Sequence, residues 1–194
     1  MYTVIGARNT RAFRVIWTLE ELGLPYDLIE APAGSDLAKS HNPSGKVPAL
    51  DVDGTVITDS CAIMTYLADK HAGLTYAAGT IERARQDAFL HQINDEIDAL
   101  LWTAARHSFV LPADKRVPNV KDSLKWEFAR NLDRITDQIT GPFLMGDTLT
   151  IADILLVHCG GWAMAAKFPM ENAAFKEYSK SIRSRAAFGR AMGQ

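Results

Sequence analysis

The stretch KVPALDVDGTVITDS, residues 46–60, decides how the first part of the chain is predicted to fold. The pair Asp53-Gly54 lies between two apolar runs, and an Asp-Gly pair in that setting is a strong signal for a β-hairpin. A helix is expected to follow over residues 60–71, where Ile63 and Leu67 lie on one face. The stretch therefore predicts two antiparallel strands followed at once by a helix.

Upstream of this hairpin the chain alternates between strand and helix signals. Residues 2–5 form a short β-rich run, and residues 26–30 form a second one. Between them, apolar residues recur at helical spacing over residues 12–22, and Gly23 ends that helix. A strand, a helix and a strand with a crossover of this length predict a parallel βαβ unit. With the hairpin and its helix, the order βαβ-ββα defines an α/β domain over residues 1–73.

Residues 74–80 are polar and small, and we interpret them as a linker. The chain after them, residues 81–194, is expected to be an all-α bundle. Periodic apolar residues indicate one long helix from near Ile81 and a second across residues 124–139. A third, residues 151–167, is apolar almost all round and should be the buried centre of the bundle.

Thr150-Ile151-Ala152-Asp153 is expected to begin that central helix with a capping box. In this motif the Thr150 side chain satisfies the N–H of Asp153, while the Asp153 carboxylate accepts from the N–H of Thr150. We interpret the motif as purely structural. Its position in the chain marks the beginning of the central helix.

Composition excludes several classes of protein. With 194 residues, 47% of them hydrophobic, and a net charge of -2, the chain is neither disordered nor a basic nucleic-acid binder. No run approaches the ~20 apolar residues of a membrane span, and no signal peptide is evident. Two cysteines cannot form a disulfide framework, and the histidines lack metal-ligand spacing. We therefore expect a cytoplasmic protein with no metal, no nucleic acid and no membrane among its ligands.

The chain resembles the cytosolic glutathione transferase superfamily, in its bacterial type with a serine- or threonine-like active site. The resemblance extends over almost the whole chain in the right order, and the segments that carry it are Ala12–Tyr26, Asn42–Pro48, Lys46–Leu50, Thr58–Ser60 and Gly146–Asp153. It implies a thioredoxin-like N-terminal domain, a helical C-terminal domain, and a homodimer. It also implies a detoxification enzyme that conjugates glutathione, as co-substrate, to a small hydrophobic electrophile.

The resemblance also implies residues that bind glutathione. A cis bond between Val47 and Pro48 would leave the Val47 backbone open to pair with an extended peptide. Ser60 and the first N–H groups of its helix would hold the γ-glutamyl carboxylate, and Asp59 its ammonium; the alternative for Asp59-Ser60 is an N-cap alone. Lys46 would pair with the glycyl carboxylate, or is simply solvated.

The thiol-activating residue is less defined. Members of the superfamily place a Tyr, Ser or Cys after the first strand, whereas this chain has Ala7-Arg8-Asn9-Thr10-Arg11. Thr10 could donate its hydroxyl to a thiolate, or Asn9 its amide, with Arg11 adding positive charge; the alternative is a helix cap without contact to sulfur. Since no Cys is present here, cysteine-type chemistry is not expected.

The electrophile is expected to bind between this turn and the helix that carries Trp102 and Arg106. An aromatic ring and a cation suit a flat, electron-poor or anionic substrate, although Trp102 could equally be a core residue. Two other functions remain open. One is a glutathione-dependent isomerase, lyase or peroxidase on the same scaffold, and the other is a non-catalytic binding or dimerisation protein.

Overall fold

The computed structural model describes all 194 residues, which form two compact units. The first unit comprises Met1–Arg83 and Arg183–Gln194, and the second comprises Ala84–Ile182. The sequence predicts a helical domain over residues 81–194, whereas in the structure the last twelve of these residues belong with the first unit. The physical reason is an aromatic and ionic contact between the final helix and the first one, described below.

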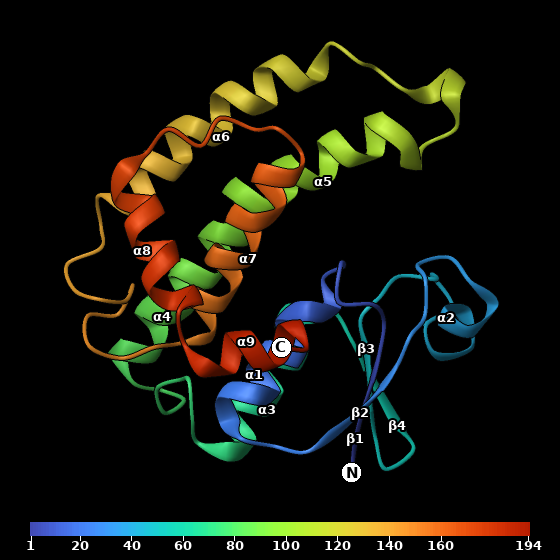
Figure 1. Cartoon of the computed structure of the whole chain (residues 1–194), viewed down its shortest axis with the longest axis vertical. Coiled ribbons are helices and arrows are strands. Elements are labelled where there is room, and N and C mark those ends of the chain that lie inside the picture. Colours follow the sequence, from blue (N-terminus) through green and yellow to red (C-terminus); the bar gives the residue numbers. More distant parts are fainter. The chain divides into compact units, whose positions relative to one another are not determined.

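The first unit contains a four-stranded sheet in the order β2-β1-β3-β4 (Figure 1). Its elements are β1 (Tyr2–Ile5), α1 (Ala12–Leu22), β2 (Tyr26–Ile29), α2 (Asp36–His41), β3 (Ala49–Val52), β4 (Thr55–Thr58), α3 (Ser60–His71) and α9 (Ala186–Met192). Strand β1 pairs with β2 in parallel and with β3 antiparallel, as the βαβ and hairpin patterns predict. The expected thioredoxin-like order of elements is confirmed.

Helices α1 and α3 pack against each other and against the strands of the sheet. This packing buries every residue of α1 from Ala12 to Leu19. The short helix α2, which was not predicted, begins at the N-cap Ser35 and contributes Ala38 to a small core cluster with Ile5 and Ala49.

Helix α9 completes the first unit by packing on α1 (Figure 1). The Phe188 ring meets the Trp17 ring edge-on, with centroids 4.9 Å apart. Arg185 donates to both carboxylate oxygens of Glu21 at 2.8 Å, and Arg190 donates to Glu20 at 2.8 Å. An apolar contact with ion pairs on its rim holds the end of the chain on the first helix.

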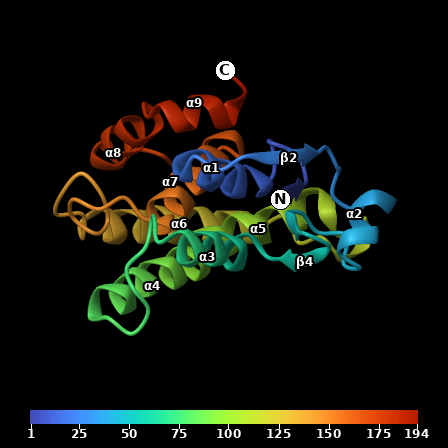
Figure 2. The ribbon, with the colours of Figure 1, turned by 90° about the horizontal axis from the view of Figure 1, so that it is seen from below.

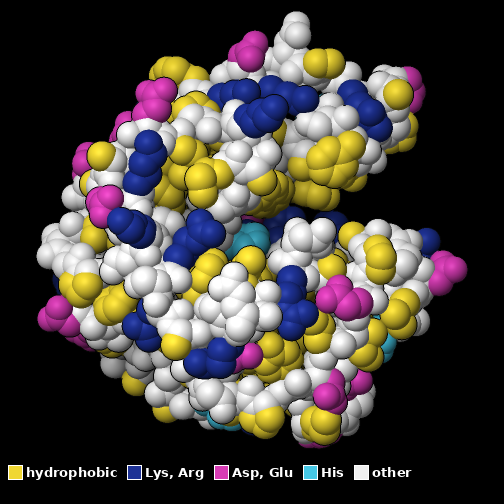
Figure 3. All heavy atoms as spheres, in the orientation of Figure 1, with side chains coloured by type: hydrophobic (Ala, Val, Ile, Leu, Met, Phe, Trp, Pro, Cys, Tyr) yellow, Lys and Arg dark blue, Asp and Glu magenta, His cyan; other side chains and the backbone are white.

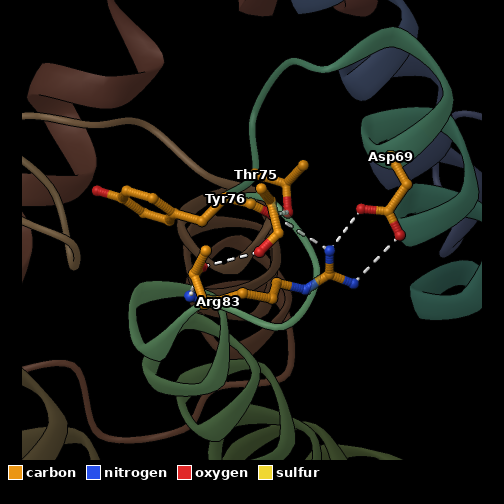
Figure 4. A network of polar contacts seen from close by, with 6 residues as sticks. Asp69, Thr75, Tyr76 and Arg83 are labelled. Carbon is orange, nitrogen blue, oxygen red and sulfur yellow. Dashed lines mark hydrogen bonds and ion pairs between the residues drawn. The ribbon is translucent and has the colours of Figure 1, made fainter.

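The segment predicted as a linker is bound to its neighbours by hydrogen bonds (Figure 4). The Arg83 guanidinium forms an ion pair with Asp69 near the end of α3 and donates to the Tyr76 carbonyl at 3.3 Å. Thr75 donates to the same carbonyl at 3.3 Å. Residues 75 and 76 are therefore held between the end of α3 and the beginning of the next helix.

The second unit is helical, as predicted. Its elements are α4 (Ile81–Ile93, which begins in the first unit), the π-helical turn η1 (Asn94–Asp98), α5 (Ala99–Ala105), the π-helical turn η2 (Arg106–Val110), the 3-10 turn η3 (Ala113–Lys115), α6 (Val120–Thr136), α7 (Ile151–Ala165) and α8 (Ala173–Arg183). Helices α5 and α6 pack side by side (Figures 1 and 2). Helix α7 is buried over residues 151–157, which confirms its central position.

The capping box at the start of α7 is present, and its carboxylate accepts from four donors. Asp153 accepts from the N–H of Thr150 at 2.7 Å and its hydroxyl at 3.0 Å, from the N–H of Leu144 at 2.8 Å, and from the Tyr178 hydroxyl at 2.7 Å. Burial raises the pKa of Asp153 above its ordinary value, although these hydrogen bonds favour the charged form. Burial, together with the charge of Asp153, raises the pKa of Tyr178 well above its ordinary value.

No helix in the structure is both long and apolar enough to span a membrane. On the face shown in Figure 3, basic and acidic side chains alternate over the surface rather than separating into two regions.

Candidate functional site

Strand register places three of the predicted site segments at one end of the sheet. Ile5 at the end of β1 lies opposite Ala49 at the start of β3, and Ala49 lies opposite Thr58 at the end of β4. The segments that continue from these residues are the turn at 6–11, the pair Val47-Pro48, and the pair Asp59-Ser60. Neighbouring strands lie ~4.8 Å apart, so the three segments extend over roughly 10 Å, about the length of an extended tripeptide.

Gly6 brings the beginning of α1 close to the sheet. Its φ of 148° lies outside the range that other residues adopt readily, and a Cβ at this position would lie 2.6 Å from the Ala12 Cβ. The same Cβ would lie 3.3 Å from the Val47 Cβ. Only glycine therefore allows the first turn of α1 and the Val47 loop to lie so near each other.

The Thr10 hydroxyl is used within the turn. It donates to the Ala7 carbonyl at 2.6 Å and accepts from the Ala12 N–H at 3.1 Å, as a helix cap does. Because a hydroxyl has one proton, Thr10 can donate to a thiolate only by giving up the Ala7 carbonyl.

Asn9, next to Thr10, is the other expected donor. Its side chain is exposed, and its amide makes no hydrogen bond within the protein. Arg11 is half-buried directly before α1, at the N-cap position. Arg8, in the same turn, donates through Nε to the Ala191 carbonyl at 3.1 Å. In this turn, therefore, the Asn9 amide is a side-chain donor without an acceptor.

The peptide bond between Val47 and Pro48 is cis, as the resemblance implied. The Val47 N–H and carbonyl make no hydrogen bond within the protein, so both are available to an added peptide strand. The preceding loop is held by Asn42, whose side-chain amide donates to the Lys46 carbonyl at 2.9 Å. The Lys46 side chain is exposed and has no acidic partner.

Asp59 is the N-cap of α3. Its Oδ1 accepts from the N–H groups of Cys61 at 2.9 Å and Ala62 at 3.1 Å, which confirms the structural part of the prediction. The backbone of Asp59 has a φ of 72° and a ψ of 124°, a conformation that residues other than glycine rarely adopt and that concentrates at functional sites. Ser60, the first residue of α3, is buried, and its Oγ accepts from Arg14 Nη1 at 3.2 Å.

Trp102 and Arg106 lie one helical turn apart in the second unit, both half-buried. Arg106 donates through Nη2 to Thr103 Oγ1 at 3.0 Å, whereas its buried Nε has no acceptor. Arg106 also begins the π-helical turn η2, one of two such turns that the apolar periodicity did not reveal. No group of three or more His, Cys, Asp or Glu side chains that could hold a metal ion occurs in the structure.

Comparisons with known proteins agree with this architecture. Residues 10–70 match the model of the glutathione S-transferase N-terminal domain. Glutathione S-transferase F13 from Arabidopsis thaliana is 30% identical over 159 residues, which cover 73% of this chain and 70% of that protein. Maleylacetoacetate isomerase from Rhizobium meliloti is 28% identical over 160 residues, covering 77% of this chain and 75% of that protein. The alignment with glutathione S-transferase alpha I from Oryctolagus cuniculus, 26% identical, covers 73% of this chain and 63% of that protein.

Solved structures extend the likeness to both units. A glutathione transferase from Methylococcus capsulatus is 28% identical with a TM-score of 0.87, over 100% of this chain and 98% of that one. Glutathione transferase URE2P6 from Phanerochaete chrysosporium, in complex with oxidized glutathione, is 25% identical with a TM-score of 0.83, over 99% and 94% of the two chains.

The mixed sheet, the cis-proline loop and the helical unit together define the class of cytosolic glutathione transferases. This chain belongs to the glutathione S-transferase family. Membership makes it a glutathione-dependent enzyme of that class.

Proposed function

We propose that glutathione binds across the end of the sheet, with its γ-glutamyl end at Asp59-Ser60, its cysteinyl backbone at the Val47 loop and its thiol at the turn before α1. The cysteinyl backbone pairs with Val47 next to Pro48, and the glycyl carboxylate pairs with Lys46. The observation that carries this proposal is the register of Ile5, Ala49 and Thr58, because it aligns the three segments at the spacing of an extended tripeptide.

The thiol is then placed at the turn before α1. A free thiol has a pKa of ~8.5, so few molecules are ionised at neutral pH. A hydrogen bond to sulfur and the N-terminus of a helix lower this value, and each unit corresponds to ~1.4 kcal/mol. Of the two expected donors, Asn9 is favoured, because the Thr10 proton already has an acceptor. Arg11 adds positive charge at the same turn.

The thiolate attacks a small electrophile held by the helical unit, and we assign Trp102 and Arg106 to its binding. Arg106 supports a substrate with a partial or full negative charge, because it has no acidic partner and its Nε has no acceptor. We further propose a cytoplasmic homodimer.

A second function, a glutathione-dependent isomerase, is favoured by one observation. A maleylacetoacetate isomerase aligns with this chain over 75% of its own length. An isomerase would use the same glutathione segments and release glutathione unchanged at each turnover. Product analysis separates the two: conjugation consumes glutathione in proportion to the electrophile, whereas isomerisation does not.

The decisive experiment is a pH titration of glutathione bound to the protein, followed by thiolate absorbance in the ultraviolet. We expect bound glutathione to ionise at least about one pH unit below the free thiol's ~8.5. Ser60→Ala serves as the control variant and should weaken binding without changing the ionisation of the glutathione that remains bound. Normal ionisation of bound glutathione would contradict thiol activation at the turn, and absence of binding would contradict the whole assignment.

A further inference from the structure

An arginine lies within the apolar face of α1. Arg14 is 1% exposed and belongs to a continuous run of buried residues from Ala12 to Leu19. A buried guanidinium without hydrogen bonds is strongly destabilising, so a buried arginine must have partners. One of them is Ser60, whose Oγ lies 3.2 Å from Arg14 Nη1.

The direction of this hydrogen bond determines what Ser60 can do. A guanidinium can only donate, so Ser60 Oγ is the acceptor and its own proton must point elsewhere. That proton has no acceptor within the protein, although Ser60 is only 3% exposed. A buried hydroxyl proton without an acceptor in the protein is uncommon, and this one is available to a ligand.

The backbone of Ser60 also has a donor without an acceptor. Asp59 Oδ1 satisfies the N–H groups of Cys61 and Ala62, but the N–H of Ser60 has no acceptor in the protein. Two donors of one residue, a hydroxyl and an N–H, thus lack acceptors at the beginning of a twelve-residue helix, and a buried cation lies directly behind the hydroxyl. Two donors with positive charge behind them suit a carboxylate.

We infer that Arg14 is a positioning residue for the γ-glutamyl carboxylate of glutathione, an inference that rests on the proposed function. By occupying a lone pair of Ser60 Oγ, Arg14 fixes the hydroxyl as a donor, and its charge strengthens the attraction for the carboxylate through a single intervening hydroxyl. Arg14 does not touch glutathione itself. If Arg14 only stabilised the fold of the first unit, replacing it would weaken the binding of all ligands to the same extent.

The test compares two ligands by calorimetry. One is glutathione, and the other is γ-aminobutyryl-cysteinylglycine, which keeps the amine but lacks the carboxylate assigned to Ser60. We expect Arg14→Met to weaken glutathione binding about 10-fold or more and to change binding of the second ligand less than about 2-fold. Ser60→Ala should show the same selectivity, and the double variant should be no weaker than Ser60→Ala alone.

Two further variants keep the test conclusive. Arg14→Lys retains the charge and should keep the fold if Arg14→Met does not; we expect it to lose affinity selectively for glutathione. Arg185→Met, which removes an exposed arginine of the same unit, should affect neither ligand. Equal losses for both ligands in the Arg14 variants would overturn the inference while leaving the proposed function intact. A wild-type chain that binds neither ligand would overturn both.

Discussion

At the scale of single residues, the turn before α1 separates a structural hydroxyl from a donor available to a ligand. Thr10 closes the turn through Ala7 and Ala12, whereas the Asn9 amide makes no hydrogen bond within the protein. The two residues are adjacent, so the sequence alone left their roles open. The structure gives them different contacts, which leads to different expectations for the two alanine variants.

We expect Asn9→Ala to raise the pKa of bound glutathione by about one unit, because the thiolate loses a hydrogen bond. Thr10→Ala should instead lower the free energy of unfolding by about 1 kcal/mol through loss of the cap, with a smaller change in the thiol. Ultraviolet titration and urea unfolding of both variants measure the two effects. The reverse pattern would assign the sulfur contact to Thr10.

How much of the site was predictable depends on the distance in sequence between its parts. The cis-proline loop was predicted from the family resemblance and the Asp59 cap from its position directly before a helix, and the structure contains both. The contact of Arg14 with Ser60 joins positions 46 residues apart, and at the sequence level Arg14 is simply a charged residue in an amphipathic helix. Local patterns identify caps and turns, whereas a buried polar pair is defined by packing.

At the scale of elements, the beginning of α7 combines burial with a charged group. The pKa of Asp153 is higher in the native state than in the unfolded chain, so the Asp153 carboxylate binds a proton more tightly in the native state. Between the two pKa values the native state holds more protons, and stability falls as the pH rises.

We therefore expect the Asp153 contribution to stability to decrease as the pH rises upward from about 4, the ordinary pKa of Asp. Asp153→Asn should remove this pH dependence while lowering stability overall, because an amide cannot accept from all four donors. Urea unfolding of the wild-type protein and the variant at a series of pH values gives the free energy of unfolding of each as a function of pH, and the two slopes against pH are compared. Equal slopes would show that Asp153 does not titrate in this range.

Two adjacent glycines in α7 provide a matched pair. A Cβ at Gly160 would lie 2.5 Å from Cζ of the buried Phe175 ring, whereas a Cβ at Gly161 would meet nothing within 4 Å. Gly160→Ala should destabilise the protein by about 1–3 kcal/mol through overpacking. Gly161→Ala should stabilise it by up to about 1 kcal/mol through helix propensity. Thermal unfolding compares them, and equal effects would contradict the packing argument.

Elements were predicted where the apolar pattern is long and missed where it is short or interrupted. Helix α2 has six residues and one buried side chain, so no periodicity reveals it. The π-helical turns η1 and η2 each insert an extra residue, which shifts the apolar face; the helix continues after η1 into α5 and ends after η2 at the extended residue Leu111. In η1, Asn131 of α6 donates to the Glu96 carbonyl at 3.0 Å, a contact between helices that no local pattern encodes.

At the scale of the whole molecule, the first unit is discontinuous in sequence. The boundary predicted from composition divided the chain once, but α9 returns to α1 after the whole helical unit. The final residues could not be assigned from their own pattern, because their partners Trp17, Glu20 and Glu21 lie at the other end of the chain.

Phe188→Ala should test this contact. We expect a loss of about 2 kcal/mol in the free energy of unfolding and a red shift of Trp17 fluorescence, because the indole loses its edge-on partner. Met192→Ala, which changes an exposed residue of the same helix, should have little effect. Unchanged stability in Phe188→Ala would show that α9 contributes little to the first unit.

The return of α9 also determines the order in which the protein can be completed during synthesis. A ribosome synthesises a chain from its N-terminus, so the sheet and α1 are made before the second unit, whereas α9, which packs on α1, is made after it. Until then the Trp17 and Phe13 rings lack the Phe188 ring that packs on both of them. The first unit therefore cannot finish folding until the second unit and α9 have both been synthesised.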